Sequence, residues 1–397
     1  MLKSVTTATR AIQNIEQATR ELAPANTVFE AGRAVGLLFC SADADGAALS
    51  AALHSQLKIP IAGMTSQSLL TRSGRQEKSA ILTIISSDDC SFGVGVSAPL
   101  DADGGAHHRA NIAAAYTASA RMAAESPKLM FAFCPANMPF SGDKYSQILT
   151  ELSGAAPVIG GVASDEYDFT HCKTFLSGQA YQNALVLVSL FGDIRPVFSM
   201  QHVTSRFAPR LRRITDARDN VVHRVGDETF TEYLASFGLD AASRNPLVDL
   251  VSHPMMLTTE GTGEASVMRH IAALDPANGT GTFLGDVLPG TLANICRLDS
   301  QDVKDSCRDS AQALLQKIEN AHQENYTYSL VFCVSCCGRA TILGEEIDEE
   351  GATLSALVPA QLSLSGIYCL GELGPARYYN GNAANKFHNC SITLCAI

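Results

Sequence analysis

Three cysteines lie close together in the C-terminal third of the chain, where they could bind a metal or exchange disulfides. Cys333 and Cys336 have the C-x-x-C spacing, and Cys337 follows directly. A zinc site would need a second pair at similar spacing, which the later cysteines do not provide. A redox motif would open a helix after the strand, whereas Gly338 predicts that the chain continues as a turn. The pattern therefore favours a buried strand that ends in a turn.

Familiar catalytic motifs are absent from the sequence. It contains no Walker-type phosphate loop, no G-x-S-x-G elbow and no H-E-x-x-H pair. Among the ten histidines, His253 and His388 adjoin apolar segments. Cys336 as a nucleophile beside His388 is the weakest hypothesis, because no local spacing sets their geometry. We therefore expect a protein that is not an enzyme and has no catalytic residues.

Two charged residues lie in glycine-rich turns between apolar segments. They are Arg339, which follows Gly338, and Glu372, which follows Gly371. A charge that is buried in such a place needs a partner. The two side chains either pair with each other or with the backbone, or they recognise a ligand. The sequence supports both interpretations equally.

The composition is that of a globular protein with two domains. A chain of 397 residues is too long for one ordinary core, and 46% hydrophobic residues can fill two. The net charge of −11 argues against a nucleic-acid partner. No apolar run reaches the roughly 18 residues of a membrane span, and the N-terminus lacks the apolar core of a signal peptide. We expect a cytoplasmic protein whose 12 cysteines are reduced thiols.

The pattern of apolar residues predicts helices and strands that alternate along the chain. Residues 1–24 have apolar side chains at helical spacing, and Pro24 ends the predicted helix. Residues 79–86 and 91–97 are two β-rich runs joined by four residues, which predicts a hairpin. Hairpins among the helices favour a mixed α/β fold over a purely parallel sheet.

We expect two modules, each with a mixed, hairpin-containing sheet flanked by helices. An N-terminal helix at residues 1–29 precedes a first module at residues 30–220 and a second at residues 221–397. The sheets of the two modules are expected to be separate and to pack against each other.

Five short segments resemble motifs of the FIST sensory family, in the family's order. Residues 63–66 read Gly-Met-Thr-Ser, which is similar to the G-C-S-T turn, and residues 157–165 resemble P-[IV]-I-G-G-x-A-S-D. Residues 334–339, 366–374 and 387–391 resemble the S-C-x-G-R, G-[FI]-Y-x-x-G-E-[IL]-G and H-N-x-[ST] elements. Each motif is weak alone, but five in order are specific.

The resemblance spans about residues 30 to 395 and includes the N-type and C-type modules. Two departures concern the first motif. Met64 stands where the family has cysteine, and Gln67-Ser68 replace its Gly-Glu. The ligand preference of an N-terminal pocket therefore need not follow the family.

The resemblance implies an intracellular sensor of a small ligand. The message would pass by protein contact to a histidine kinase or to a cyclic-di-GMP synthase or phosphodiesterase, and a homo-oligomer is compatible with this role. Some stand-alone members with two modules bind haem and sense nitric oxide, so the most specific expectation is a haem-dependent nitric oxide sensor. The alternative is a sensor of an amino acid or another small polar metabolite without haem.

The resemblance also suggests which residues bind the ligand. A haem needs an axial His, Cys, Met or Tyr, and the candidates are His388, His253, Cys336 and Tyr368. A polar metabolite would instead be recognised by a second group of residues. This group is Arg339, Glu372 and Asn389.

Overall fold

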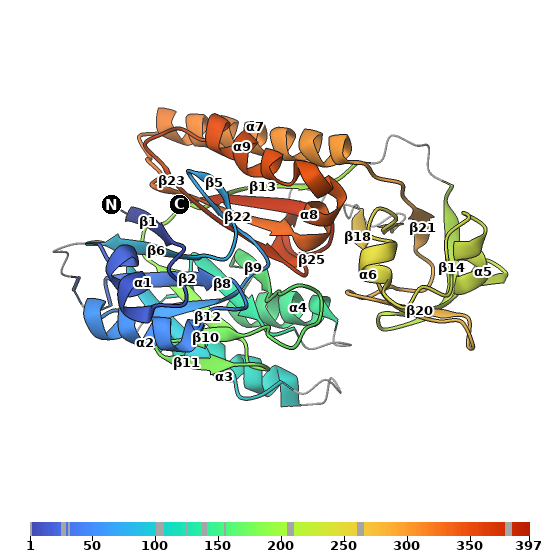
Figure 1. Ribbon diagram of the computed structural model, residues 1–397, viewed down its shortest axis with the longest axis horizontal. Helices are drawn as coiled ribbons and strands as arrows, with labels where there is room; N and C mark the ends of the chain where they lie inside the picture. The colour runs from blue at the N-terminus through green and yellow to red at the C-terminus, as the bar shows by residue number, and fades with distance from the viewer. Residues whose placement is uncertain are drawn as a thin grey trace.

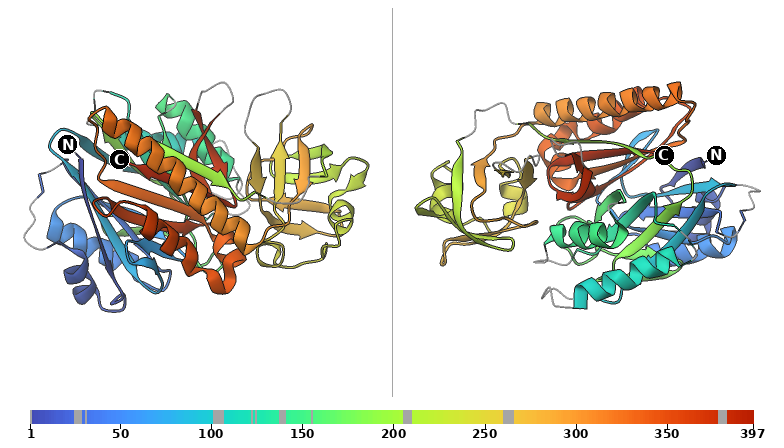
Figure 2. Two further views of the ribbon diagram at one scale, coloured as in Figure 1. Left: turned by 90° about the horizontal axis from the view of Figure 1, so that it is seen from above. Right: turned by 180° about the vertical axis from the view of Figure 1, so that it is seen from behind.

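The computed structural model of the protein describes residues 2–24, 29, 30, 32–100, 107–121, 123, 125–136, 141–154, 156–204, 210–259, 266–377 and 383–397. These residues form a body of three six-stranded sheets and a smaller lobe of eight strands. The lobe stands to one side of the body (Figure 1; Figure 2). The mixed α/β class predicted from the sequence is confirmed.

The first unit of the body consists of a strand and a helix, a parallel β-α-β pair, a hairpin and a returning strand. Its elements are β1 (Leu2–Thr9), α1 (Ile15–Leu22), β2 (Ala34–Cys40), α2 (Gly46–Leu57), β3 (Ile61–Thr65), β4 (Leu69–Thr71), β5 (Gly74–Gln76) and β6 (Ala80–Ser87).

The second unit repeats this order of elements. They are β7 (Ser91–Val96), α3 (His107–Ala120), β8 (Leu129–Cys134), α4 (Gly142–Ser153), β9 (Val158–Val162), β10 (Thr174–Leu176), β11 (Gln179–Tyr181) and β12 (Val186–Phe191).

The third unit has the same order, but the lobe is inserted after its first strand. The elements of this unit are β13 (Val197–His202), α7 (Ser300–Gln323), β22 (Leu330–Cys336), α8 (Cys337–Leu343), the 3-10 turn η1 (Gly344–Glu346), α9 (Asp348–Leu357), β23 (Ser363–Cys369), β24 (Glu372–Arg377), β25 (Ala383–His388) and β26 (Ser391–Ala396).

None of the helices in the described ranges has the length and apolar composition that crossing a membrane requires.

The three sheets share one strand order. They run β1-β6-β2-β3-β10-β11, β7-β12-β8-β9-β24-β25 and β13-β26-β22-β23-β4-β5. The hairpin at the end of each sheet comes from another unit: β4–β5 joins β23, β10–β11 joins β3, and β24–β25 joins β9. The units are therefore interlocked in a closed cycle. The expectation of two separate sheets is wrong, because strands cross between the N-terminal and C-terminal halves.

The core of the body lies where the first parallel strands of the three units meet. These strands, β2, β8 and β22, are buried along their whole length because both faces are covered. The ring of Phe39 lies 5.3 Å from that of Phe133 and 5.6 Å from that of Phe332. Aromatic contacts at this distance join the three sheets into one hydrophobic core.

The lobe has a hydrophobic core of its own, built around Phe230 and Phe283. A buried ion pair between Arg269 and Asp143 of α4, with 2.7 Å between Nη2 and Oδ2, attaches it to the body. Its elements are β14 (Arg212–Arg218), β15 (Val221–Val225), β16 (Glu228–Thr229), α5 (Phe230–Ala235), α6 (Pro246–Asp249), β17 (Met255–Thr258), β18 (Val267–Arg269), β19 (Ile271–Asp275), β20 (Thr280–Phe283) and β21 (Leu292–Ile295).

Three local predictions are wrong. The N-terminal helix begins only at Ile15, because half of residues 2–9 are β-branched (one Val and three Thr) and the segment pairs with β6 as a strand. Residues 79–97 form no hairpin, since β6 pairs with β1 and β2 whereas β7 pairs with β12 in another sheet. The turn expected after Cys336 is the helix α8, which begins at Cys337. In all three places distant strand pairing or packing overrides the local pattern.

Candidate functional site

Arg339, on α8, is buried among protein partners rather than placed in a pocket. Its side chain is not exposed, and its Nε and Nη2 atoms lie 2.9 and 2.5 Å from Oε2 of Glu350 on α9. The remaining guanidinium donors bond to the Ser306 hydroxyl at 2.8 Å and to O of Val303 at 3.2 Å. The pairing with Glu372 that the sequence left open is wrong; Glu350 fills that place.

Glu372, the first residue of β24, is fully buried, and neither of its carboxylate oxygens has a hydrogen bond of normal geometry. Burial raises the pKa of this carboxyl well above its ordinary value. The Cys336 thiol and the Ser391 hydroxyl lie close enough to oppose this rise in pKa without cancelling it. The folded protein therefore favours the protonated form of this carboxyl more than water does.

His388 faces Glu372 across the β24–β25 pair and is also fully buried. Its Nε2 atom lies 3.3 Å from O of Gly374, and its Nδ1 atom lies 3.3 Å from Nε2 of His202. Burial, with smaller effects from His202 and Arg269, lowers the pKa of His388 well below its ordinary value. A neutral imidazole has one donor and one acceptor, and these two contacts use both.

Asn389, next to His388, makes contacts inside the protein. Its Nδ2 atom donates to O of His388 at 3.0 Å, and its Oδ1 atom accepts the N–H of His270 at 3.3 Å. Asn389 therefore connects β25 to the lobe, and its amide is not aimed at a pocket.

The candidate haem ligands do not fit a haem in this structure. Both ring nitrogens of His388 have protein partners, and Cys336 and Tyr368 are buried within the sheet. Burial raises the pKa of the Cys336 thiol, which disfavours the thiolate that would bind iron. His253 is half-buried in the lobe, and neither it nor the other three candidates line the pockets at the surface of the described residues.

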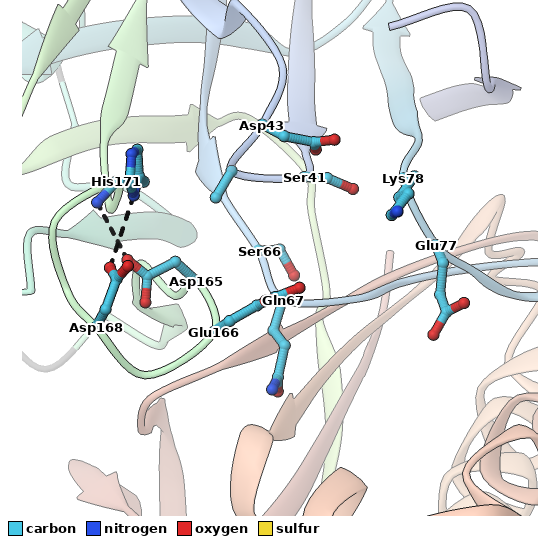
Figure 3. Close-up of a pocket in the computed structure, with 11 residues that line it drawn as sticks. Ser41, Asp43, Ser66, Gln67, Glu77, Lys78, Asp165, Glu166, Asp168 and His171 are labelled. Atoms are coloured by element: carbon cyan, nitrogen blue, oxygen red, sulfur yellow. Dashed lines mark hydrogen bonds and ion pairs between the residues drawn. The ribbon is translucent and has the colours of Figure 1, made fainter.

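A pocket of about 490 Å³ opens instead at the carboxyl ends of strands β2, β3 and β9. Four short segments line it, and their polar side chains gather around the opening (Figure 3). In chain order the lining residues are Ser41, Ala42, Asp43, Ser66, Gln67, Glu77, Lys78, Asp165, Glu166, Asp168 and His171.

Three of the segments that resemble family motifs meet beneath this pocket. The Ser164 hydroxyl donates to O of Tyr368 at 2.7 Å, and the Ser66 hydroxyl lies 2.8 Å from the same oxygen. Gln67 donates its N–H to the Ser164 hydroxyl at 2.9 Å. Tyr368 thus takes part through its backbone, whereas its own hydroxyl is buried elsewhere without a partner. The motifs that the sequence singled out build the floor of the pocket.

The connection from β9 to β10 forms one wall of the pocket. It has 11 residues, 163–173, because β9 ends at Val162 and β10 begins at Thr174. The equivalent connections in the other units have three residues, 66–68, and two residues, 370–371. Only the long connection can fold over the strand ends and enclose a space there.

Hydrogen bonds hold this loop in place. The carboxylate of Asp165, which is 3% exposed, accepts the backbone N–H groups of Phe169 and His171, each at 3.1 Å. The Tyr167 hydroxyl lies 2.9 Å from the hydroxyl of Thr341 on α8. The loop is therefore attached both to itself and to the third unit.

The pocket carries an excess of negative charge. One carboxylate oxygen of Asp165, one of Asp168 and one ring nitrogen of His171 all lie within 4.8 Å of one another. Hydrogen bonds from the backbone and hydroxyl of Thr170 lower the pKa of Asp168 to about 2, so this side chain stays ionised. The lining includes five carboxylates, and Lys78 is its one Lys or Arg. Such a surface attracts a positively charged group.

Most of these lining residues carry no local sequence signal that predicts a site. Asp165 closes a recognised motif, but nothing in the local pattern of Asp43, Glu77, Lys78 or Asp168 predicts that they share a cavity. The spacing Asp-x-x-Asp-x-x-His at the end of the second motif was the signal that could have been used.

The interlocked fold thus carries a polar pocket whose floor is built by segments that resemble family motifs. Residues 34–228 match the FIST N domain, and residues 228–375 match the FIST C domain. The chain therefore belongs to the FIST family, whose domains are small-ligand sensory domains in signal transduction. The two matches meet within the lobe, at the first residue of β16.

The solved structures that align with this chain include a remote one. A crystal structure of cyanuric acid hydrolase from A. caulinodans aligns with 100% of this chain and 99% of that chain, at 7% identity and a TM-score of 0.34. A similarity at this level carries no argument about function. No curated protein matches the sequence.

Proposed function

We propose that this protein senses a small polar ligand that carries a positively charged group, such as an amino acid or another small amine. The ligand would bind in the pocket at the ends of β2, β3 and β9. The observation that carries the proposal is the single long connection, 163–173, which encloses a space at one of three equivalent positions. A connection that is long in only one of three equivalent units is best explained by a function of that unit.

The charges of the pocket support this class of ligand. An ammonium group near Asp165 and Asp168 would donate charge-assisted hydrogen bonds to two carboxylates. Lys78, which lines the same opening, could pair with the carboxylate of an amino acid. An anion without an amine would be repelled by the acidic lining. We therefore favour the amino acid or amine over haem.

A ligand panel tests the proposal. Thermal shift followed by calorimetry should find binding among amino acids and small amines and none among dicarboxylates of similar size. Asp165→Asn and Asp168→Asn should each weaken binding about tenfold or more, the usual effect of losing a hydrogen bond to a charged group. Glu319→Gln, an exposed position on α7, is the matched control. Binding that survives both pocket substitutions would place the ligand elsewhere.

The haem expectation is tested on the same preparation. Protein mixed with haem and passed through a desalting column should show no Soret band, because both ring nitrogens of His388 have protein partners and Cys336 and Tyr368 are buried within the sheet. A stable band that shifts with nitric oxide and disappears in His388→Ala would reverse this preference.

As the receiver of the signal we propose a histidine kinase or a cyclic-di-GMP enzyme, the partners that the family resemblance implies. The amine found by the panel should change the activity of such an enzyme only when this protein is present. An unchanged activity across both enzyme classes would argue for another receiver.

A further inference from the structure

The hairpin β4–β5 connects the pocket to a distant helix. It leaves the first unit after Ser68, pairs with β23 of the third unit, and returns at Glu77 and Lys78, which line the pocket. The hairpin lies against α9: a side chain on Gly351 would come within 2.8 Å of the backbone N of Arg75. The same segment therefore contacts the proposed ligand site and a helix outside it.

Arg72, at the end of β4, holds the C-terminal end of α9. Its guanidinium donates to four carbonyl oxygens there. Three of these bonds are 2.6 to 2.7 Å long, and the fourth is 3.3 Å. They satisfy carbonyls in the last turn and C-cap of the helix and in the segment that follows it. The four acceptors are Ser355, Val358, Pro359 and Leu362.

Arg75, on β5, holds the other end of the helix. Its Nε atom lies 2.7 Å from Oδ1 of Asp348 in the first turn of α9, and its Nη1 atom lies 2.5 Å from Oε1 of Glu77. The Arg75 side chain is 10% exposed, whereas both carboxylates are largely exposed. One guanidinium is thus shared between a carboxylate of the pocket and a carboxylate of α9.

Helix α9 is connected in turn to the interior of the third unit. Glu350 in its first turn accepts from Arg339 of α8 and from the Ser335 hydroxyl of β22. A change at Asp348 therefore occurs two residues from a buried ion pair that joins three elements of the body.

We propose that the β4–β5 hairpin transmits the state of the pocket to α9, an inference that rests on the proposed function. The bound amine brings positive charge into the pocket that Glu77 lines, and this charge draws the Glu77 carboxylate away from Arg75. Arg75 then pairs with Asp348 alone, and the N-terminal end of α9 becomes more tightly held. Arg75 has two arrangements: it is shared between Glu77 and Asp348, or it is paired with Asp348 alone. Ligand binding shifts the equilibrium toward the second arrangement.

The substitution Glu77→Gln tests the coupling without any ligand, because it removes the charge that a bound cation would neutralise. Hydrogen exchange of the full chain should slow roughly twofold to fivefold at the amides of Asp348–Leu357, the range expected of a partly exposed ion pair. Glu166→Gln removes another carboxylate of the same pocket that lies on the loop after β9. It should leave exchange in α9 unchanged.

A second background shows whether Arg75 is the link. In Arg75→Gln, α9 should exchange faster than in the parent, and adding Glu77→Gln should change nothing further. An equal response to Glu77→Gln and Glu166→Gln overturns the coupling, as does a Glu77→Gln effect that persists without Arg75. Amine binding with no response in α9 leaves the proposed function standing, whereas a response in α9 without any amine binding overturns only the proposed function.

Discussion

Arg339 and Glu350 form an ion pair in which neither side chain is exposed to solvent. The Nη2 and Oε2 atoms are 2.5 Å apart, and Ser335 and Ser306 satisfy further polar atoms of the pair. Burial disfavours a charged guanidinium, but Glu350 more than offsets this and raises the pKa of Arg339. The arginine of the S-C-x-G-R segment thus joins α8 to α9.

Glu350→Gln should lower the free energy of unfolding by about 3 to 5 kcal/mol, because it leaves the buried guanidinium without its counter-charge. Urea titration measures this effect. Glu345→Gln, an exposed neighbour on the 3-10 turn, should stay within about 0.5 kcal/mol of the parent. A loss below about 1 kcal/mol at Glu350 would mean that the pair contributes little.

Glu372→Gln should stabilise the protein increasingly as the pH rises. Burial raises the pKa of this carboxyl above its unfolded value in the folded state, so the parent loses stability as pH increases above about 4.5. Gln has no proton to lose. The difference between variant and parent should grow by up to about 1.4 kcal/mol per pH unit until the folded pKa is reached. Chemical denaturation between pH 5 and 8 checks this slope, and a flat difference would contradict it.

His388→Ala should lower the melting temperature whether or not an amine is bound. The side chain bridges Gly374 of β24 and His202 of β13, so its loss removes two buried contacts at a cost of about 1 to 3 kcal/mol. The ligand-dependent part of the stability should be unchanged, because His388 does not line the pocket. Loss of amine binding in this variant would show that His388 contributes to the ligand site.

Thiol counting should find close to 12 free groups in denaturant and few under native conditions. All 12 cysteines are buried, and burial raises the pKa of Cys134, Cys333 and Cys395 among others. A raised pKa together with burial slows reaction with Ellman's reagent. A substantially lower count in denaturant would reveal disulfides.

Gly63→Ala should prevent stable folding or cost more than about 3 kcal/mol. A Cβ atom at this position would lie 1.6 Å from the backbone O of Leu38 on the neighbouring strand. Gly160 is the equivalent position in the second unit, with 2.0 Å to O of Ala132. Alanine at Gly226, a turn with open space, should cost less, mainly because of its positive φ. Circular dichroism melts compare the two variants.

The sequence alone determined several local elements, the mixed class and the family. The strand over Leu129–Cys134, the helix over Gly46–Leu57 and the start of α7 after Asp299 follow from apolar runs and a capping residue, which are local signals. Glycine had to appear in the first family motif because the backbone of Leu38 leaves no room for a side chain.

Only the tertiary structure decided how these elements combine. The exchanged hairpins, the strand at residues 2–9 and the pairing of Arg339 with Glu350 rather than Glu372 depend on contacts between segments far apart in the chain or brought together by folding. The pocket is formed in the same way, since its lining comes from four separate connections that each look like an ordinary polar loop. Local periodicity describes the faces of a helix or strand, but it carries no information about which strand ends will meet.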